Sequence, residues 1–176
     1  MTFGGKPIVL LSRIALMASL VLAIFIIPHF ALADTYYIVA GPNGGGCAPI
    51  GTWDDSTATS TLTSDVVGDI QITSPSITLD GNGHVLSVDD QTGFTDGVSV
   101  NQQFGVTIKN LSIHGGHTGI LFDTVQGGSA INNSINSNFG IDVFSSSGVT
   151  VEGNHIEGTA GAPNDTGIVA SFNSAL

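Results

Sequence analysis

The chain has 176 residues, of which 24 are glycine and only 10% are charged, a composition that fits one domain rather than several. Its formal net charge is −11, and Lys109 is the single Lys or Arg after residue 13, against 14 acids between 34 and 176. Nucleic-acid binding needs clustered Lys and Arg to neutralise phosphates, so no nucleic acid is expected as a partner. Polyanionic sugars are disfavoured for the same reason, unless a divalent cation such as Ca²⁺ bridges the two acidic partners.

Residues 1–33 have the pattern of an export signal. Two basic residues open the segment, Ile14–Ile27 is a continuous apolar run, and Ala31-Leu32-Ala33 is a small-x-small cleavage pattern. A single membrane anchor is the alternative, but the apolar run is shorter than the roughly 20 residues that span a bilayer. We therefore expect a signal peptide and a secreted chain, extracellular or periplasmic, with no membrane contact beyond the signal.

Residues 34–65 form an irregular stretch that we expect to act as an N-terminal capping segment. Thr35–Ala40 is typical of a short strand, and the glycine-rich turn Gly41–Gly46 follows it. A solenoid needs an atypical end unit to cover its first apolar layer. The segment also holds the only tryptophan, Trp53, and the only cysteine, Cys47, which excludes an internal disulfide.

From Val66 onward, β-branched residues alternate with polar residues. This period of two, interrupted often by glycine, predicts short strands, and no apolar stripe of helical period occurs after residue 34. Two polar excursions, 89–96 and 158–165, interrupt the alternation. Insertions of this kind are expected in loops on the surface of a repeat protein.

One short pattern recurs three times between Gly105 and Ile156. It is GVTIKNLSI at 105–113, GGSAINNSI at 127–135 and GVTVEGNHI at 148–156, so the opening glycines are 22 and then 21 residues apart. A second run follows each copy, at 119–122, 140–144 and 167–172. A fixed period with two strand-like runs per period predicts a stacked solenoid over residues 66–176.

Alignment of the repeats places small or branched apolar side chains in columns, such as Ile113 with Ile135 and Ile156. One repeat cannot bury its apolar face alone, but stacking at about 4.8 Å merges the columns into one core. Asn133 and Asn154 hold equivalent turn positions, where stacked asparagines can hydrogen-bond one another. The remaining columns are Val106 with Gly128 and Val149, Ile108 with Ala130 and Val151, Ile120 with Ile141 and Ile168, and Phe122 with Val143 and Ala170, the last two extended upstream by Val98 and Val100.

These repeats, together with ITLDGNGH at 77–84, resemble the secreted right-handed parallel β-helix proteins of the pectate-lyase-like superfamily. Within it they are similar to the broad group that includes the periplasmic copper-pathway protein NosD. The resemblance implies an all-β fold, a right-handed parallel β-helix of four to five coils. No capping segment follows the last run at 167–172, so we expect a chain truncated at its C-terminus or an end-to-end contact through the last coil.

Two polar columns contain candidate binding residues. His117, Asn138 and Asp165 each lie two residues before a second-run glycine, and Thr95 lies one coil earlier. A ladder of His, Asn and acid could hold a divalent cation or contact sugar hydroxyls. The alternative is an ordinary solvent-facing edge, because every surface position of a solenoid stacks into a column. The second column, which follows the inward isoleucine, consists of His114, Asn136 and Glu157.

Catalytic candidates are Asp165, Asp142 and His117. Inverting hydrolysis of a glycoside needs two carboxyls roughly 6.5–9.5 Å apart, and Asp142 and Asp165 could approach that separation across a coil. A lyase of the related families generally uses Arg or Lys as base, and Lys109 is the only such residue here. Asp89 and Asp90 could bind Ca²⁺, but no resident metal or cofactor is otherwise predicted.

The leading hypothesis is an exported, non-catalytic β-helix scaffold or surface module that contacts neutral polysaccharide through a strand face. It depends on a regular repeat without an assembled catalytic constellation. The alternatives are a fragment of a polysaccharide lyase or glycoside hydrolase and a periplasmic accessory protein of the NosD type.

Overall fold

The computed structural model describes residues 34–90, 93–158 and 166–171. The chain divides into two units, 1–32 and 33–176, and all described residues belong to the second. Within them, every regular element is a strand apart from the three-residue 3-10 helix η1 (Pro42–Gly44). No helix in this part of the chain is long and apolar enough to cross a membrane.

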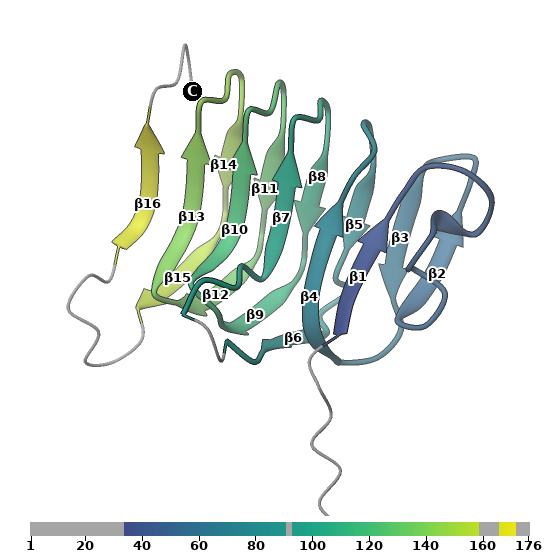
Figure 1. The fold of residues 1–176 in the computed structure, drawn as a ribbon, viewed down its shortest axis with the longest axis horizontal. Helices are drawn as coiled ribbons and strands as arrows, with labels where there is room; N and C mark the ends of the chain where they lie inside the picture. The colour runs from purple at the N-terminus through teal and green to yellow at the C-terminus, as the bar shows by residue number, and fades with distance from the viewer. Residues whose placement is uncertain (1–33, 91–92, 159–165, 172–176) are drawn as a thin grey trace, which may run out of the picture. The chain divides into compact units, whose positions relative to one another are not determined.

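Each complete coil contains three short strands, and the chain then returns to lie beside the strand where the coil began (Figure 1). The third coil consists of β8 (Thr107–Lys109), β9 (Ser112–Gly115) and β10 (Thr118–Asp123). The other complete coils are β5 (Thr78–Asp80), β6 (Val85–Val88) and β7 (Val98–Asn101); β11 (Ser129–Ile131), β12 (Ser134–Ser137) and β13 (Phe139–Phe144); and β14 (Thr150–Glu152), β15 (His155–Gly158) and β16 (Thr166–Ser171).

Like strands of successive coils pair in parallel and form three faces. Face A contains β7, β10, β13 and β16, face B contains β5, β8, β11 and β14, and face C contains β6, β9, β12 and β15. In the first coil, β4 (Val66–Ile72) serves two faces, because its start pairs with β6 and its end with β7. The predicted all-β parallel solenoid is therefore confirmed.

Residues 34–62 lie at the first end of the stack. Strand β1 (Asp34–Ile38) pairs in parallel with β4, and β3 (Thr59–Leu62) pairs in parallel with β5 of face B. Strand β2 (Gly51–Asp54) is antiparallel to β3, the one antiparallel strand pair among the described strands. The thiol of Cys47 is buried against the hydroxyl of Ser60 at 2.7 Å, and burial raises the pKa of that thiol.

The prediction of two strands per period was wrong, because the first run of each repeat is divided into two strands. Asn110 (φ +52°), Asn132 (φ +53°) and Gly153 (φ +65°) lie at this division and adopt the left-handed conformation that Asn and Gly tolerate best. The chain turns there, from face B to face C. The apolar alternation continues through the turn, which is why the sequence pattern shows one run.

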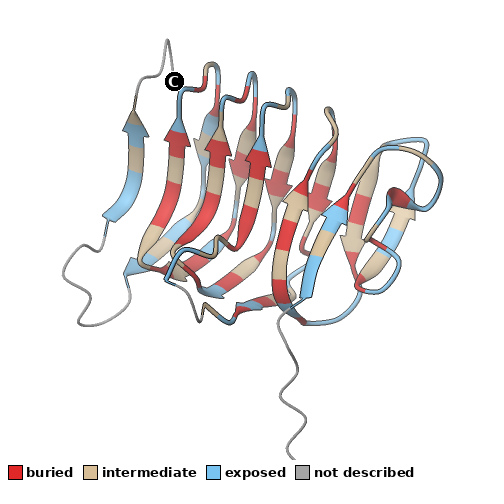
Figure 2. Cartoon of the chain, viewed as in Figure 1, coloured by how far each residue is buried: buried red, intermediate tan, exposed pale blue. Residues whose placement is uncertain are grey.

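The predicted apolar columns are confirmed by the strand register. Ile135 lies between Ile113 and Ile156, and Leu86 extends this column by one coil. Figure 2 shows buried residues as red bands that alternate with tan and pale blue along β7, β10 and β13, whereas β16 is pale blue and tan. Ile113, Ile120 and Phe122 are fully buried, as expected for a single dry interior.

The predicted asparagine stack is present, with Asn133 buried and Asn154 half-buried. Asn133, only 2% exposed, accepts a hydrogen bond from the Leu111 N–H and donates to the Ile108 carbonyl, both at 3.1 Å. Its amide also donates to Asn154 Oδ1 at 2.9 Å. The stack thus links three successive coils and satisfies backbone groups at the turn between faces B and C.

A second column, made of Gly97, Gly119, Gly140 and Gly167, lies at the corner between faces C and A. A Cβ on Gly119 would lie 2.7 Å from the Gly140 carbonyl oxygen and would overlap the Ile135 side chain. Gly97 and Gly140 are similarly crowded, whereas a Cβ on Gly167 would meet nothing within 4 Å. Close approach of neighbouring coils therefore requires glycine at Gly97, Gly119 and Gly140, but not at Gly167.

We expect Gly119→Ala to lower the free energy of unfolding by about 2–3 kcal/mol, because the added methyl overpacks the corner. Gly167→Ala is the matched control from the same column and should change stability by less than about 0.5 kcal/mol. Urea denaturation followed by circular dichroism measures both. Equal effects of the two substitutions would contradict the close-approach explanation.

We expect Asn133→Ala to lower the free energy of unfolding by about 2–3 kcal/mol, because the buried Leu111 N–H and the Ile108 carbonyl of the preceding coil lose a hydrogen-bond partner. Asn101→Ala, at an exposed position at the end of β7, is the control and should be nearly neutral. The same denaturation experiment compares them. A loss below about 1 kcal/mol for Asn133→Ala would show that the stack contributes little.

Candidate functional site

The corner between faces C and A brings together polar and aromatic side chains from three coils. His117 precedes β10, and its backbone N–H donates to the Thr95 carbonyl at 2.7 Å. The His117 carbonyl in turn accepts from the Phe139 N–H at 2.8 Å. We call the set Phe94, Asp96, His117, Thr118, Phe139 and Asp142 the Asp96 corner.

His117 lies at the centre of this corner. Its Nδ1 is 3.8 Å from Asp96 Oδ1 and 3.3 Å from the Thr118 hydroxyl. Its ring centroid is 4.9 Å from that of Phe139 and 6.0 Å from that of Phe94. Phe94 is 80% exposed, so an aromatic face is presented to solvent beside the imidazole and the carboxylate.

The loop that carries Phe94 and Asp96 is organised by Asp90. One carboxylate oxygen of Asp90 accepts hydrogen bonds from the backbone N–H groups of Gly93, Phe94 and Thr95, at 2.7, 3.1 and 3.2 Å. These bonds outweigh the effect of burial and lower the pKa of Asp90. The described part of this surface excursion therefore has a defined conformation next to the corner.

Asp96 is a partly desolvated acid whose side chain is only 20% exposed. Burial raises the pKa of its carboxyl, and the charge of Asp90 adds to the rise. Hydrogen bonding to Thr118 and the nearby His117 oppose the rise without cancelling it. The carboxyl therefore holds its proton to a higher pH than an exposed aspartate does.

Asp142 is the second desolvated acid of the corner. It lies on β13 at an outward position, between Leu121 of β10 and Val169 of β16. Its Oδ1 is buried and has no hydrogen-bond partner within the described residues. Burial raises the pKa of this carboxyl, and the charge of Asp96 raises it further. A buried acceptor oxygen is thus unsatisfied among the described residues, at a carboxyl on which the charges of Asp96 and His117 act.

The column of His114, Asn136 and Glu157 is formed on face C as predicted, with Ser87 one coil earlier. Its side chains bond within their own strands, however: His114 with Ser112 at 3.2 Å, and Glu157 with His155 at 3.0 Å. Among the described residues, no side-chain hydrogen bond joins one coil to the next along this column. The geometry matches a solvent-facing edge.

Other sequence candidates are placed as follows. Asp165 lies outside the described residues, and so does its predicted approach to Asp142. Asn138 follows His117 in its column, bonded through its backbone to Gly116 and Thr166. Lys109 Nζ forms an ion pair with Asp80 Oδ2 of the preceding coil at 3.1 Å, so the one cation of the repeats supports the stack.

The described residues contain no group of three or more His, Cys, Asp and Glu side chains that could hold a metal ion. The predicted Ca²⁺ candidate, Asp89 with Asp90, lies in the loop beside the corner. One oxygen of Asp90 is already used by the three backbone donors of that loop. The described groups of the corner can form hydrogen bonds, make aromatic contacts and exchange protons.

The chain was compared with known proteins. A family model described as the right handed beta helix region matches residues 68–176, which is most of the described coil structure. The chain belongs to the right-handed β-helix family. A search of curated proteins and a search of solved structures found no match. Membership of this family explains the coiled fold, but it does not identify a ligand.

Sequence reasoning identified His117 and Asp142 but missed Asp96, Phe94 and Phe139. A signal was present for Asp96, since it follows Thr95, the upstream member of the His117 column. Its register shows that it shares a column with Thr118 and Phe139. The aromatic residues carried no signal, because nothing in their spacing places them around one imidazole.

Asp142→Asn should stabilise the fold at neutral pH by about 1 kcal/mol, a value discounted for the partial exposure of the group. A carboxyl whose pKa is raised on folding favours the folded state below its unfolded pKa, and this contribution is lost as pH rises through the folded pKa. The advantage of the variant should therefore be largest near pH 7 and vanish below about pH 4.

Denaturant unfolding of the two proteins at a series of pH values measures this difference. Asp96, His117 and Asp123 also act on Asp142 electrostatically, but they are common to both proteins, so the comparison isolates Asp142. A variant that is less stable than the parent at pH 7 would show that Asp142 has a stabilising partner.

Proposed function

We propose that this β-helix is an exported surface module that binds neutral polysaccharide at the Asp96 corner without cleaving it. The observation that carries the proposal is the grouping of the His117 imidazole with the Asp96 carboxyl and the exposed ring of Phe94. A carboxyl and an imidazole can hydrogen-bond sugar hydroxyls, while the exposed ring packs on an apolar face of the sugar.

The corner has the groups that sugars require. A pyranose offers hydroxyls as donors and acceptors and C–H faces as apolar surface. Asp96 and Asp142 supply carboxyl groups, His117 supplies ring nitrogens, and Phe94 supplies an exposed ring. A few polar groups beside aromatic surface are the general composition of a small-molecule site.

Electrostatics favours an uncharged polymer. Residues 34–176 contain 14 acids and one Lys or Arg, and that lysine is engaged with Asp80. A uronate chain approaching Asp96 and Asp142 would meet like charges with no compensating cation. The N-terminal pattern of a basic start, an apolar run and an Ala-x-Ala site supports a secreted or periplasmic location, where such polymers occur.

Glycoside hydrolysis is the second candidate function. Asp96 and Asp142 both have raised pKa values, and the charge of one acts on the other. Of two such acids, the protonated one can donate to a leaving oxygen while the ionised one activates water. We prefer binding because it needs only the contacts described. Hydrolysis also requires that a water molecule and the glycosidic bond lie between the two carboxyl groups.

The test is affinity electrophoresis of the full chain in gels containing galactan, xyloglucan, mannan or starch, with polygalacturonate as the charged comparison. We expect at least one neutral polymer to retard the protein. Asp142→Ala and His117→Ala should weaken that binding about tenfold, as expected for loss of one charged hydrogen bond. His155→Ala, on an exposed histidine of β15, is the matched control and should leave it unchanged.

Reducing ends are measured on the same polymers. Release of reducing ends that Asp96→Asn and Asp142→Asn both abolish would replace the binding proposal with the hydrolase. Retardation by no neutral polymer, or equal retardation of parent and corner variants, would reject the Asp96 corner as the site.

A further inference from the structure

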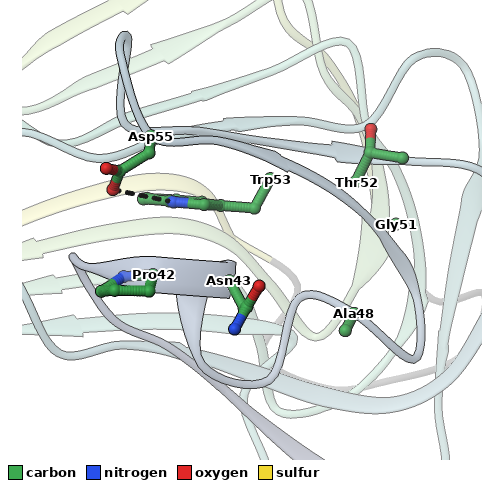
Figure 3. A pocket seen from close by; sticks show the side chains of 7 residues that line it. All are labelled: Pro42, Asn43, Ala48, Gly51, Thr52, Trp53 and Asp55. Carbon is green, nitrogen blue, oxygen red and sulfur yellow. Dashed lines mark hydrogen bonds between the residues drawn. The ribbon is translucent and has the colours of Figure 1, made fainter.

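A separate open pocket of about 560 Å³ lies between β2 and the turn that contains η1, around the only tryptophan of the chain (Figure 3). Trp53 and Asp55 lie on one side of it and Pro42, Asn43 and Ala48 on the other. Gly51 and Thr52 of β2 complete the lining. The pocket shares no residue with the Asp96 corner.

The indole ring is held in place before any ligand arrives. Trp53 Nε1 donates to Asp55 Oδ1 at 3.3 Å, and Trp53 pairs with Ser60 across the β2–β3 hairpin. The backbone of Gly44 lies against the ring so closely that a Cβ there would be 2.5 Å from Trp53 Cδ2. Gly44 also has φ +61°, so both the contact and the turn require glycine.

The polar side chains that line the pocket are exposed to solvent and do not belong to the core. Asn43, Thr52 and Asp55 are all in the exposed class, while Trp53 is half-buried and packs partly on the core. A fixed aromatic surface flanked by an amide, a hydroxyl and a carboxylate is typical of a ligand-binding site rather than of core packing. Its volume lies within the range of roughly 300–1,000 Å³ typical of small-molecule sites.

We propose that this pocket binds a single uncharged sugar residue, stacked on Trp53 and hydrogen-bonded by Asn43 and Thr52. The electron-rich face of an indole attracts the slightly positive C–H groups on one face of a pyranose. The amide and the hydroxyl supply both donors and acceptors for sugar hydroxyls. The pocket lining contains a carboxylate and no cation, which disfavours uronates and phosphorylated sugars.

The inference does not depend on the Asp96 corner, because a different aromatic and different polar groups carry it. Where both sites are occupied by one polymer, the second contact becomes intramolecular and tightens binding without any new chemistry. A chain with both sites would therefore bind long glycans more tightly than short ones.

The single tryptophan makes the test direct. The full chain is titrated with methyl β-glucopyranoside, methyl β-galactopyranoside, cellohexaose and maltohexaose, with hexagalacturonate as the charged comparison, and tryptophan emission is followed. We expect a saturable change with at least one neutral sugar, in the millimolar range for the methyl glycosides, because so small a ligand makes few contacts.

Asn43→Ala and Thr52→Ala keep the tryptophan and should each raise the dissociation constant at least threefold. Thr63→Ala, on an exposed threonine outside the pocket lining, is the matched control for Thr52→Ala and should not alter it. Asp142→Ala should leave the methyl-glycoside titration unchanged, which separates this proposal from that for the Asp96 corner.

Three outcomes would overturn the proposal. The first is an emission that no neutral sugar changes up to 100 mM, which is about the weakest affinity that one sugar contact gives. The second is hexagalacturonate binding at least as tightly as cellohexaose and maltohexaose. The third is a titration that Asn43→Ala, Thr52→Ala and Thr63→Ala all leave the same as in the parent.

Discussion

Parallel pairing of each strand with the strand one coil away is the constraint on which this structure depends. Ile135 lies between Ile113 and Ile156 because the pairing register repeats at 21 or 22 residues. A repeat shifted by one residue would exchange the inner and outer sides of its strands. The register therefore fixes the core, the asparagine stack and the glycine corner together, since each requires like positions to lie directly above one another.

The sequence was sufficient to predict which side chains stack in columns, but it did not reveal how many strands make up one coil. Periodicity records which side chains point inward, so the core residues could be assigned from alignment alone. It does not record where the chain turns, because Asn110 and Asn132 change direction through a left-handed conformation without interrupting the apolar alternation. Two strands per coil were expected for that reason, and three are present.

Periodicity also determines which residues of the site could be predicted from the sequence. His117 and Asp142 were found because each occupies a recurrent position of a repeat. Phe94 comes from the excursion between β6 and β7, which has no counterpart in the next coil, and Asp96 lies at the end of that excursion, in line with Thr118 and Phe139 rather than with another acid. The Asp96 corner arises where this non-repeating loop meets the repeating edge, and a repeat alignment contains only one of these two parts.

Comparison of Asn133 with Asp142 shows why the corner differs from the rest of the surface. The amide of Asn133 has partners in the coil before it and the coil after it, so this fold satisfies buried polar groups where they serve the stack. Asp142 has a buried oxygen without a partner among the described residues, and its pKa is raised by burial and then by the charge of Asp96. A serine or threonine at this outward position would keep the coil and avoid the desolvated charge. A carboxylate that lowers stability where the fold does not need it is typical of a functional position, because function rather than stability retains such a group.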